Sequence, residues 1–496
     1  MSFGTLLETA LAGSLRRDPA AVLPAFADLP PEDRLLRSAS YAGLRRLAGR
    51  PLDPVAAVVV VEPCGPEALK AISPAAGARL LEILAGQPAL LLEWLDLAEQ
   101  GKWRVSHDCL PELLDHAIAH ADIHDRVMLV GGERLSWLAN LKPEWHFAAR
   151  IDPDEQFATG TPTERARALR RIRRQNPARG RQLLEAVFYG RTERAETRSV
   201  LLDALREGLS AADEPLVQQA VQDSRKELRE KGLRLICRIP DSRFAQRWIE
   251  RAHRLVVVRE HVVDVREPGE LDPVWLDDGL DPHPPKGMGA TAWIIQQTLA
   301  FTPPSIWPHD ALPAIQRNDW SQPLLSGLAQ AAAAYAEADW CETLLLARAN
   351  VRTNAVRPPG SDTGSVPAAN PADALNLNAA ALLRALAPDR REAVVVRLLE
   401  VGAPGVAALI ASSTHPWSQG FSQRIMAHLP ELIEKWQHAA GAFLHTAALR
   451  IDPTVLPEAE HVLETAIEPS WARPALQRLV KTLRFRLAMR QELQPA

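Results

Sequence analysis

Cysteine is scarce in this chain, and its four cysteines lie far apart along the sequence. None of them forms a Cys-x-x-Cys pair with another. Few, scattered cysteines are typical of a reducing compartment rather than of a disulfide framework. We therefore expect reduced and mostly buried thiols at these four positions: Cys64, Cys109, Cys237 and Cys341.

A long hydrophobic run is also missing. The longest, VAAVVVVEPC at 55–64, is far too short to span a bilayer. The N-terminal segment has no basic residues ahead of its apolar stretch, as a signal peptide would. Neither charge sign is in excess, because 57 Lys and Arg residues oppose 61 Asp and Glu residues, for a formal net charge of −4. Global charge therefore attracts neither nucleic acid nor a membrane, and we expect a cytoplasmic protein.

Motifs for nucleophilic catalysis are missing as well, since Gly-x-Ser-x-Gly does not occur. The segment PKGMGATAW at 285–293 places Lys286 before a predicted helix, whose N-terminus could hold an anion, but it lacks the Walker spacing. Loops on rigid scaffolds often carry function, so Lys286 and Trp293 remain candidates for binding a partner or an anion. We expect no enzymatic activity, no cofactor and no metal.

Amphipathic helices are what the sequence does contain. In DSRKELREKGLRLICRIPDS, at 223–242, leucine and isoleucine recur on one helix face. Ser224 and Glu227 have the spacing of a capping box, and Ser242 offers the cap of the next helix. Gly232 lies on the apolar face, where its cost of about 1 kcal/mol is tolerable if another helix backbone crosses closely.

Each such helix has one apolar face, which it can bury only by stacking on neighbours. The pattern predicts a mostly all-α fold: a HEAT-like α-solenoid of antiparallel helix pairs. Valine-rich, partly alternating sequence predicts a small irregular or β-containing insertion near 254–290. The predicted regions are an N-terminal helical region at 1–150, HEAT-like repeats at 151–253, an irregular segment with helices at 254–354, a flexible linker at 355–373 and a C-terminal helical region at 374–496.

Near the N-terminus, the segment 31–49 predicts a helix, and 73–86 predicts another with Ser73 as its cap and Pro74 at its first position. The leucines expected to face inward from the first of these helices are Leu35, Leu36, Leu44 and Leu47.

A basic run, RARALRRIRRQNPARGR, occupies 165–181. Folded as two helices, it could form a patch that pairs with phosphates or with an acidic protein surface. Alternatively, it is a solvated face neutralised by Asp and Glu on neighbouring helices. The candidate partner- or anion-binding residues in it are Arg167, Arg170, Arg171, Arg174 and Arg181.

Two histidine-containing motifs are interpreted as structural. His116, His120 and His124 have i, i+4, i+8 spacing, which would place them on one face of a helix. Two of them could share a zinc ion, but a site needs further ligands, so we interpret them as an exposed or half-buried stripe. HPWSQGF, at 415–421, predicts a turn with Trp417 as a packed aromatic anchor.

The chain resembles an uncharacterised bacterial family of HEAT-like helical proteins, the domain of unknown function 5691. The resemblance covers nearly the whole chain and rests on these segments: CGPEALKAISPAAGARLLEILAG, LLLEWLDLAEQGKWRVSHDCLPELLD, WLANLKPEW, GTPTERARALRRIRRQNPARGRQLLE, GLSAADEPLVQQAVQDSRKELR, DPHPPKGMGATAWIIQQTLAFTP and HPWSQGFSQRI.

Members of that family are usually encoded beside a MoxR-like AAA+ ATPase, a von Willebrand A-domain protein and a SWIM zinc-finger protein. The resemblance implies a non-enzymatic scaffold or adaptor whose partner is the ATPase or the von Willebrand A-domain protein. It carries over no catalytic residues. The alternative is a HEAT-like nucleic-acid-binding protein, conceivably a DNA-repair protein, that uses its arginine-rich face.

Overall fold

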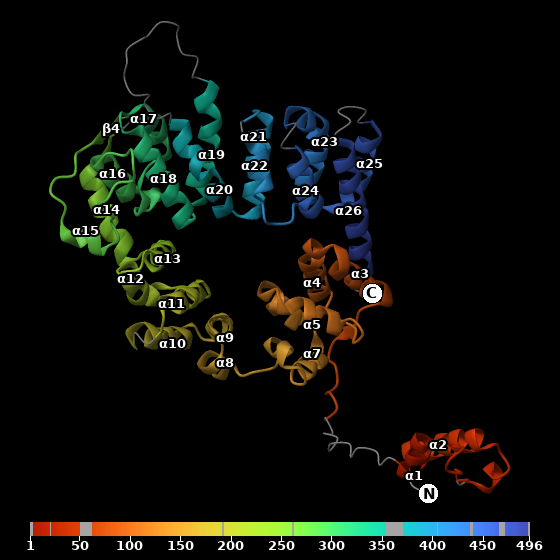
Figure 1. Ribbon diagram of the computed structural model, residues 1–496. Coiled ribbons are helices and arrows are strands. Elements are labelled where there is room, and N and C mark those ends of the chain that lie inside the picture. Colours follow the sequence, from red (N-terminus) through yellow and green to blue (C-terminus); the bar gives the residue numbers. More distant parts are fainter. Residues whose placement is uncertain are drawn as a thin grey trace. The chain divides into compact units, whose positions relative to one another are not determined.

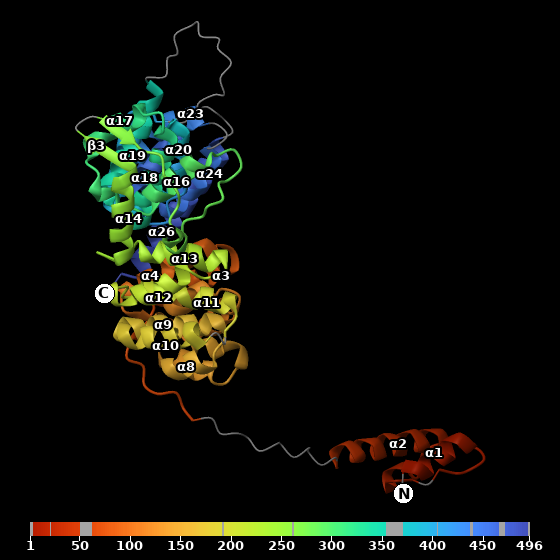
Figure 2. The ribbon, with the colours of Figure 1, turned by 90° about the vertical axis from the view of Figure 1, so that its left-hand side faces the viewer.

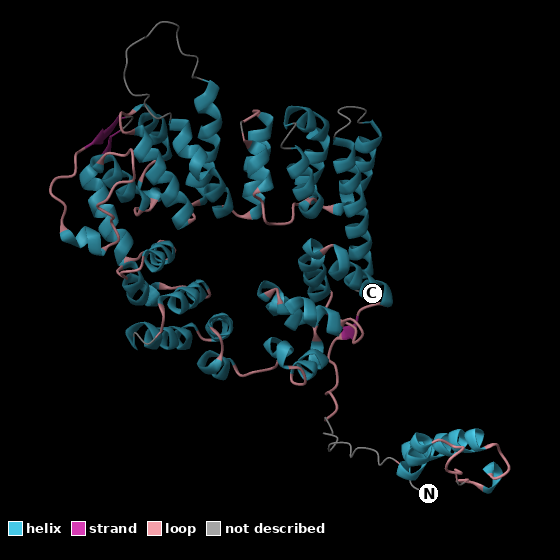
Figure 3. Ribbon diagram, viewed as in Figure 1, coloured by secondary structure: helices cyan, strands magenta, loops and turns pink. Residues whose placement is uncertain are grey.

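The computed structural model describes residues 3–19, 21–49, 62–190, 193–259, 262–353, 371–403, 405–436, 440–465 and 472–494. The linker predicted at 355–373 lies outside the described residues, apart from 371–373, which begin a helix. Residue contacts divide the chain into unit 1, Met1–Cys64, and unit 2, Gly65–Ala496. The described part of both units is mostly helical (Figure 3).

The described part of unit 1 contains two helices, α1 (Phe3–Ala12) and α2 (Pro31–Ala48), with the short 3-10 helix η1 (Pro24–Phe26) between them. The prediction that the leucines of α2 face inward is wrong for three of them. Leu36, Leu44 and Leu47 are 65%, 66% and 69% exposed. The physical reason is that a single partner helix covers only one side of α2.

The first part of unit 2 forms its own core, called here the N-terminal core. It comprises apolar residues between Ile72 and Ala149, together with Met489 and Leu493 from the far end of the chain. Its elements are β1 (Lys70–Ala71), α3 (Pro74–Gly86), η2 (Pro88–Leu90), α4 (Leu91–Gln100), β2 (Trp103–Arg104), α5 (Leu110–Ile118), η3 (Ala121–Ile123), α6 (His124–Val130), α7 (Gly132–Ala139) and η4 (Pro143–Ala148).

The start of α3 confirms the predicted cap: the Ser73 hydroxyl accepts from the Ala76 amide, and Pro74 is the first helical residue. Strands β1 and β2 pair in parallel, with Lys70 opposite Trp103.

The middle of unit 2 contains short helices that pack on their sequence neighbours. They are α8 (Pro153–Thr159), α9 (Pro162–Gln175), α10 (Pro177–Gly190), α11 (Ala195–Leu202), η5 (Asp203–Arg206), η6 (Ala211–Asp213), α12 (Glu214–Val221), α13 (Lys226–Ile236) and α14 (Arg243–Leu255). Figures 1 and 2 show α8 to α13 as consecutive layers.

Two details of α13 test the capping and glycine predictions. Gly232 does lie at a close crossing, because a Cβ there would be 2.7 Å from the Val221 amide nitrogen. The predicted Ser224 capping box is wrong, since α13 begins at Lys226 without a side-chain cap. Asp223 accepts from the Arg225 amide instead, and the cap position moves by one residue, from Ser224 to Arg225. The Ser242 cap of α14 is confirmed by its bond from the Ala245 amide.

The predicted β-containing insertion is confirmed. Strands β3 (Val256–Arg259) and β4 (Val262–Val265) pair antiparallel, with Val256 opposite Val265. Asn318 holds this pair against the following helices, because its side-chain amide donates to the Val263 carbonyl over 2.7 Å.

The remaining elements are α15 (Pro273–Asp277), α16 (Ala290–Ala300), η7 (Pro304–Ile306), η8 (His309–Ala311), α17 (Leu312–Arg317), α18 (Ser321–Tyr335), α19 (Ala338–Thr353), α20 (Pro371–Ala385), α21 (Pro388–Glu400), α22 (Val406–Ala411), α23 (Gln419–Trp436), α24 (Ala440–Arg450), η10 (Pro453–Val455), α25 (Leu456–Thr465) and α26 (Arg473–Glu492). Contacts order them in two layers. Helices α16, α18, α20, α22, α24 and α26 pack in succession, as do α19, α21, α23 and α25 (Figure 1).

These layers share a second, larger core that extends from Phe157 to Leu483 and is called here the main core. Helix α26 belongs to both cores, with Leu483 in the main core and Met489 in the N-terminal core. Three of the four cysteines are buried, as predicted. None of the helices in the described ranges is both long and apolar enough for a membrane crossing.

Candidate partner-binding groove

A buried arginine joins the two cores where α26 passes from one to the other. Arg486 is almost fully buried, and its guanidinium binds both Glu93 carboxylate oxygens of α4, at 2.5 and 3.0 Å. It also donates to the carbonyls of Ala448 and Ile451, at the end of α24. A bidentate arginine–carboxylate pair with further hydrogen bonds fixes the orientation of both partners. Helix α26 is thereby attached to α4 and α24 together.

Two further contacts attach the end of α26 to the N-terminal core, and together with the Arg486 contacts they are called here the joint. Arg79 of α3 binds Glu492 bidentately, at 2.6 and 3.1 Å, and its guanidinium lies 4.5 Å from the centre of the Phe485 ring. The hydrogen bond with Glu492 raises the pKa of Arg79 above its ordinary value. The indole of Trp103 donates to the Leu493 carbonyl over 3.0 Å. The end of α26 is therefore held by charge, hydrogen bonds and apolar packing.

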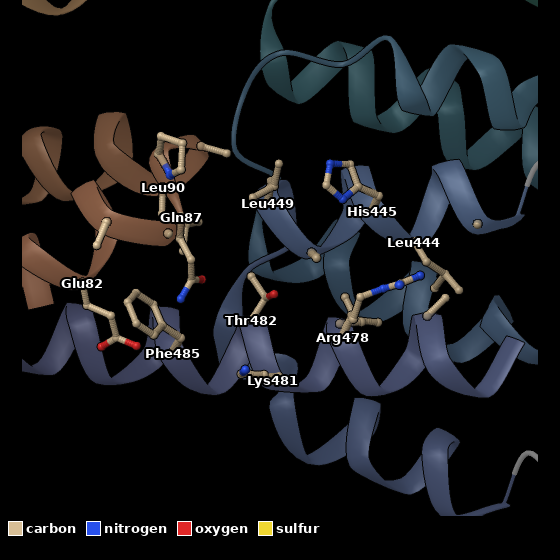
Figure 4. A pocket seen from close by; sticks show the side chains of 18 residues that line it. Glu82, Gln87, Leu90, Leu444, His445, Leu449, Arg478, Lys481, Thr482 and Phe485 are labelled. Carbon is tan, nitrogen blue, oxygen red and sulfur yellow. The ribbon is translucent and has the colours of Figure 1, made fainter. Parts of the chain in front are cut away.

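A groove lies beside this joint, between α3 and η2 on one side and α24 and α26 on the other (Figure 4). It has a volume of about 870 Å³. Its apolar lining comes from both cores: Leu90 from η2, Leu444 and Leu449 from α24, and Phe485 from α26. An apolar floor of this size between packed helices is typical of a binding site.

The rim of the groove is polar and mainly basic. Arg478 and Lys481 of α26 and His445 of α24 lie on one side of the groove, and Gln87 and Glu82 come from the side of α3 and η2 (Figure 4). Within the described ranges, Arg478 and Lys481 take part in no ion pair. The arrangement of an apolar centre and a charged rim is that of a protein interface. It can bind an apolar side chain or helix face and align an acidic group at the rim.

A second buried arginine joins the cores at α9. Arg167 donates to the Nδ1 atom of His124 over 2.6 Å and lies 3.4 Å from an Asp125 carboxylate oxygen. Because Nδ1 accepts, His124 is neutral with its proton on Nε2, which donates to the Ala117 carbonyl. Burial and then Arg167 lower the pKa of His124 below its ordinary value. The charge of Arg167 is thus engaged inside the protein.

The histidine stripe predicted on one helix face is wrong, because the helix ends too early. Helix α5 stops at Ile118, so His120 follows it and His124 starts α6. His116 and His120 do stack, with ring centres 4.3 Å apart. His124 instead stacks on Phe147, in the interior.

The other arginines of the basic run are largely paired, as the neutralised-face interpretation expects. Arg174 binds Glu207 at 3.2 Å, and Arg181 lies 3.7 Å from Asp213. Within the described residues, Arg170 and Arg171 take part in no ion pair, and both are half-buried. The structure brings these residues together on α9 and α10, as the sequence predicts, but leaves few of the charges free.

Arg173, which was not among the candidates, is the centre of this region. It has no exposed surface, binds both carboxylate oxygens of the equally buried Asp213, and donates to backbone carbonyls at the end of η5. Its carbonyl acceptors are Glu207, Pro177, Leu205 and Gly208. Carbonyls at a helix end have no partner within the helix, and Arg173 supplies one.

The loop that contains Lys286 is fixed to the scaffold at its start. Asp278 accepts hydrogen bonds from Arg247, at 2.5 and 2.8 Å, and from Arg251, at 2.6 Å. Burial pushes the pKa of Asp278 upward, but the hydrogen bonds from the two arginines outweigh it and hold the pKa below its ordinary value. Lys286 is exposed, and the Trp293 indole donates to the Asp281 carbonyl. Neither Lys286 nor Trp293 lines the groove of Figure 4.

The HPWSQGF motif forms the predicted turn and aromatic anchor. Trp417 is buried, stacks on Phe443 and meets Phe421 edge-on. Glu392 of α21 accepts from the Ser418 amide and hydroxyl, and so caps the start of α23. This cluster therefore connects α21 to α23.

The groove of Figure 4 was not found from the sequence, although most of its lining belongs to helices that were. Its two walls come from residues near 85 and near 480, and no local pattern indicates that these segments meet. The one available signal was the run of basic residues in the final predicted helix, which includes Arg478 and Lys481.

A family model for a family of unknown function, DUF5691, matches residues 5–493. The chain belongs to this family. The match covers nearly all of both units and agrees with the resemblance drawn from the sequence. No curated protein and no solved structure matches the chain.

Proposed function

We propose that the protein is a non-enzymatic α-helical scaffold or adaptor that works with a MoxR-type AAA+ ATPase or a von Willebrand A-domain protein. In this proposal the two-layer helical array is a HEAT-like solenoid, which presents one face to its partner and flexes as the ATPase turns over. The family resemblance supports the choice of partner. The groove of Figure 4 supports the mode of action.

The groove is the observation that carries the proposal. Its apolar lining comes from both cores, so a partner that fills it contacts α3 and η2 together with α24 and α26. Such a partner would respond to, or change, the angle between the cores, because the groove lies beside the contacts of Arg486 and Arg79 that attach α26 to the N-terminal core. The leucines exposed on α2 offer further apolar surface to a protein partner.

The experiment is an affinity pull-down of the tagged protein from its native cell extract, with and without ATP and with nuclease treatment. We expect a nuclease-resistant AAA+ or von Willebrand A-domain protein among the captured proteins. Recovery of nucleic acid alone, or of no protein even after crosslinking, would contradict the scaffold proposal.

A groove variant sharpens this test. Gly441 lines the groove, and a Cβ there would meet nothing within 4 Å, so Gly441→Trp adds bulk to the lining without a clash at its Cβ. Gly269→Trp is the matched control, because Gly269 also has open space and lies in a loop outside the groove. We expect Gly441→Trp to lower partner capture about tenfold, roughly 1.4 kcal/mol, and the control to leave it unchanged.

The alternative function, nucleic-acid binding, has its own test. It would depend on Arg170, Arg171 and Arg174 of the basic run, of which Arg174 is exposed and the other two are half-buried. Salt-dependent DNA binding that Glu substitutions at these three positions abolish would support it. We favour the scaffold because Arg174 is already paired with Glu207 and much of the remaining basic charge is buried.

A further inference from the structure

A second groove, called here the arginine groove, lies on another part of unit 2 and has a volume of about 1010 Å³. Four arginines line it: Arg206 at the end of η5, Arg234 on α13, Arg238 just after α13, and Arg384 on α20. They come from segments that are distant in the sequence, so only the fold gathers them.

Most of the positive charge of the arginine groove has no acidic partner among the residues that the structure describes. Within the described ranges, Arg234, Arg238 and Arg384 take part in no ion pair. Arg234 and Arg238 donate only to backbone carbonyls, those of Glu230 and Ala333. Arg206 lies 3.8 Å from Asp203, but that carboxylate is shared with Lys231, which is closer at 2.7 Å.

The lowered pKa of the Arg238 guanidinium agrees with this excess of positive charge. Burial lowers the pKa of Arg238, and its neighbour Arg206 acts in the same direction. Among the described residues, no carboxylate contributes to stabilising its charge. All four arginines are nevertheless exposed at the surface, so together they form a solvent-accessible positive patch that attracts acidic groups.

Small and apolar side chains also line the arginine groove. Ala333 and Ala334 come from α18 and Ala381 and Ala385 from α20; these four are called here the alanine floor, and Phe301 lies in the lining beside them. Small side chains let another backbone approach closely, and apolar helix faces bind in such grooves. About two turns of helix, a cylinder roughly 10 Å across and 11 Å long, fill about 900 Å³, which is close to the volume of the groove.

We propose that the arginine groove binds an acidic amphipathic helix of a protein partner, with its apolar face on the alanine floor and its carboxylates on the four arginines. The inference rests on the proposed function in one respect, that the protein acts by binding other proteins. Charge complementarity selects an acidic segment, since arginine forks pair with carboxylates and repel basic helices. The acidic helix supplies the negative charge that the groove lacks.

The test uses the full-length protein and a fluorescein-labelled synthetic helix of about 16 residues that repeats Glu and Leu at helical spacing. The same peptide with Lys in place of Glu is its counterpart. Binding is followed by fluorescence polarisation at about 0.1 M and about 0.5 M salt, because exposed charge pairs weaken as the screening length falls. We expect the Glu peptide to bind, more weakly in high salt, and the Lys peptide not to bind.

The decisive comparison is between two charge-reversed pairs. Arg234→Glu with Arg384→Glu alters lining residues from two different helices, α13 and α20, whereas Arg225→Glu with Arg243→Glu alters exposed arginines outside the groove by the same net charge. We expect the groove pair to weaken Glu-peptide binding at least about tenfold and the control pair to weaken it less than about twofold.

A steric variant, Ala381→Trp, separates the groove from charge alone, because it fills the alanine floor and keeps every arginine. It should also weaken binding about tenfold. Circular dichroism melts of all variants confirm that they are folded. Equal weakening by the groove and control pairs, or unchanged binding in the groove pair, would overturn the proposal.

The two proposals can fail separately. If the groove pair abolishes peptide binding while the pull-down recovers no protein, the arginine groove is supported and the scaffold proposal fails. If the pull-down recovers the ATPase or the von Willebrand A-domain protein equally well with the groove pair, and the peptide also binds equally well, the arginine groove is overturned and the scaffold stands.

Discussion

The arginines of α9 and α10 are neighbours in the sequence. The four arginines of the arginine groove come from separate segments: Arg206 from η5, Arg234 from α13, Arg238 from just after α13, and Arg384 from α20. The first group attracts attention in the sequence, yet the fold buries or pairs much of its charge. The second group forms no run in the sequence, yet among the described residues three of its four arginines, Arg234, Arg238 and Arg384, take part in no ion pair. The comparison teaches that a run of basic residues in the sequence does not by itself indicate a binding site. What matters is whether the folded protein provides an acidic partner for each arginine.

The largest effect is expected at Arg173, which belongs to the basic run but has no exposed surface. Arg173→Met leaves the buried Asp213 carboxylate without its bidentate partner and the end of η5 without a hydrogen-bond donor. Removing one partner of a buried pair typically costs about 3–5 kcal/mol. We expect a loss of this size in the free energy of unfolding, measured by urea denaturation.

The control is Arg174→Met, one residue away. Arg174 pairs with Glu207 on the surface, where such pairs contribute about 0–1 kcal/mol. If Arg173→Met and Arg174→Met have equal effects, burial does not distinguish the two arginines. The double variant Arg173→Met with Asp213→Leu should recover part of the loss, because no unpaired charge then remains in the core.

A middle-sized effect is expected at Arg167, where the basic run meets a neutral histidine. Folding lowers the pKa of His124, chiefly through burial and also through Arg167, so the unfolded chain binds this proton more tightly. The contribution of His124 to stability is therefore complete above its ordinary pKa of 6.5 and is lost as the pH falls through its folded value. We expect the free energy of unfolding to decrease from about pH 7.5 to about pH 5.5.

His124→Gln isolates this contribution. Glutamine can still accept from Arg167 and donate to Ala117, but it does not titrate. His116 and His415, whose pKa values burial also lowers, remain in both proteins, so the difference between the two stability curves belongs to His124. Parallel curves for the variant and the unchanged protein would show that His124 is not the titrating group.

The sequence predicted those features that depend on near neighbours in the chain. Helical periodicity, the caps at Ser73 and Ser242, and the close crossing at Gly232 all follow from a few adjacent residues. It failed where the decisive partner is remote. The exposure of Leu36 depends on which helices of unit 1 pack against α2. The start of α13 is a different, local error, because the Asp223 side chain accepts from the Arg225 amide.

The candidate site shows the same limit more clearly. Both grooves are lined by helices that the periodicity predicts, but their walls join segments separated by hundreds of residues in one groove and by more than a hundred in the other. Neither the pairing of Arg173 with Asp213 nor the gathering of Arg234 with Arg384 can be inferred from local spacing. A single sequence specifies the local elements more directly than it specifies which of them meet.

The smallest expected effect on the free energy of unfolding is at Arg384, and its sign is opposite to that expected for Arg173→Met. Arg384→Gln removes one charge from a cluster of like charges and breaks no ion pair among the described residues. We expect the free energy of unfolding to stay the same or rise by up to about 0.5 kcal/mol, more at low salt than at high salt. The measurement is urea denaturation at about 0.02 M and about 0.5 M salt. A decrease of more than about 1 kcal/mol in the free energy of unfolding would mean that Arg384 stabilises the fold as Arg173 does. Arg384 would then not be an unpaired charge available to a partner.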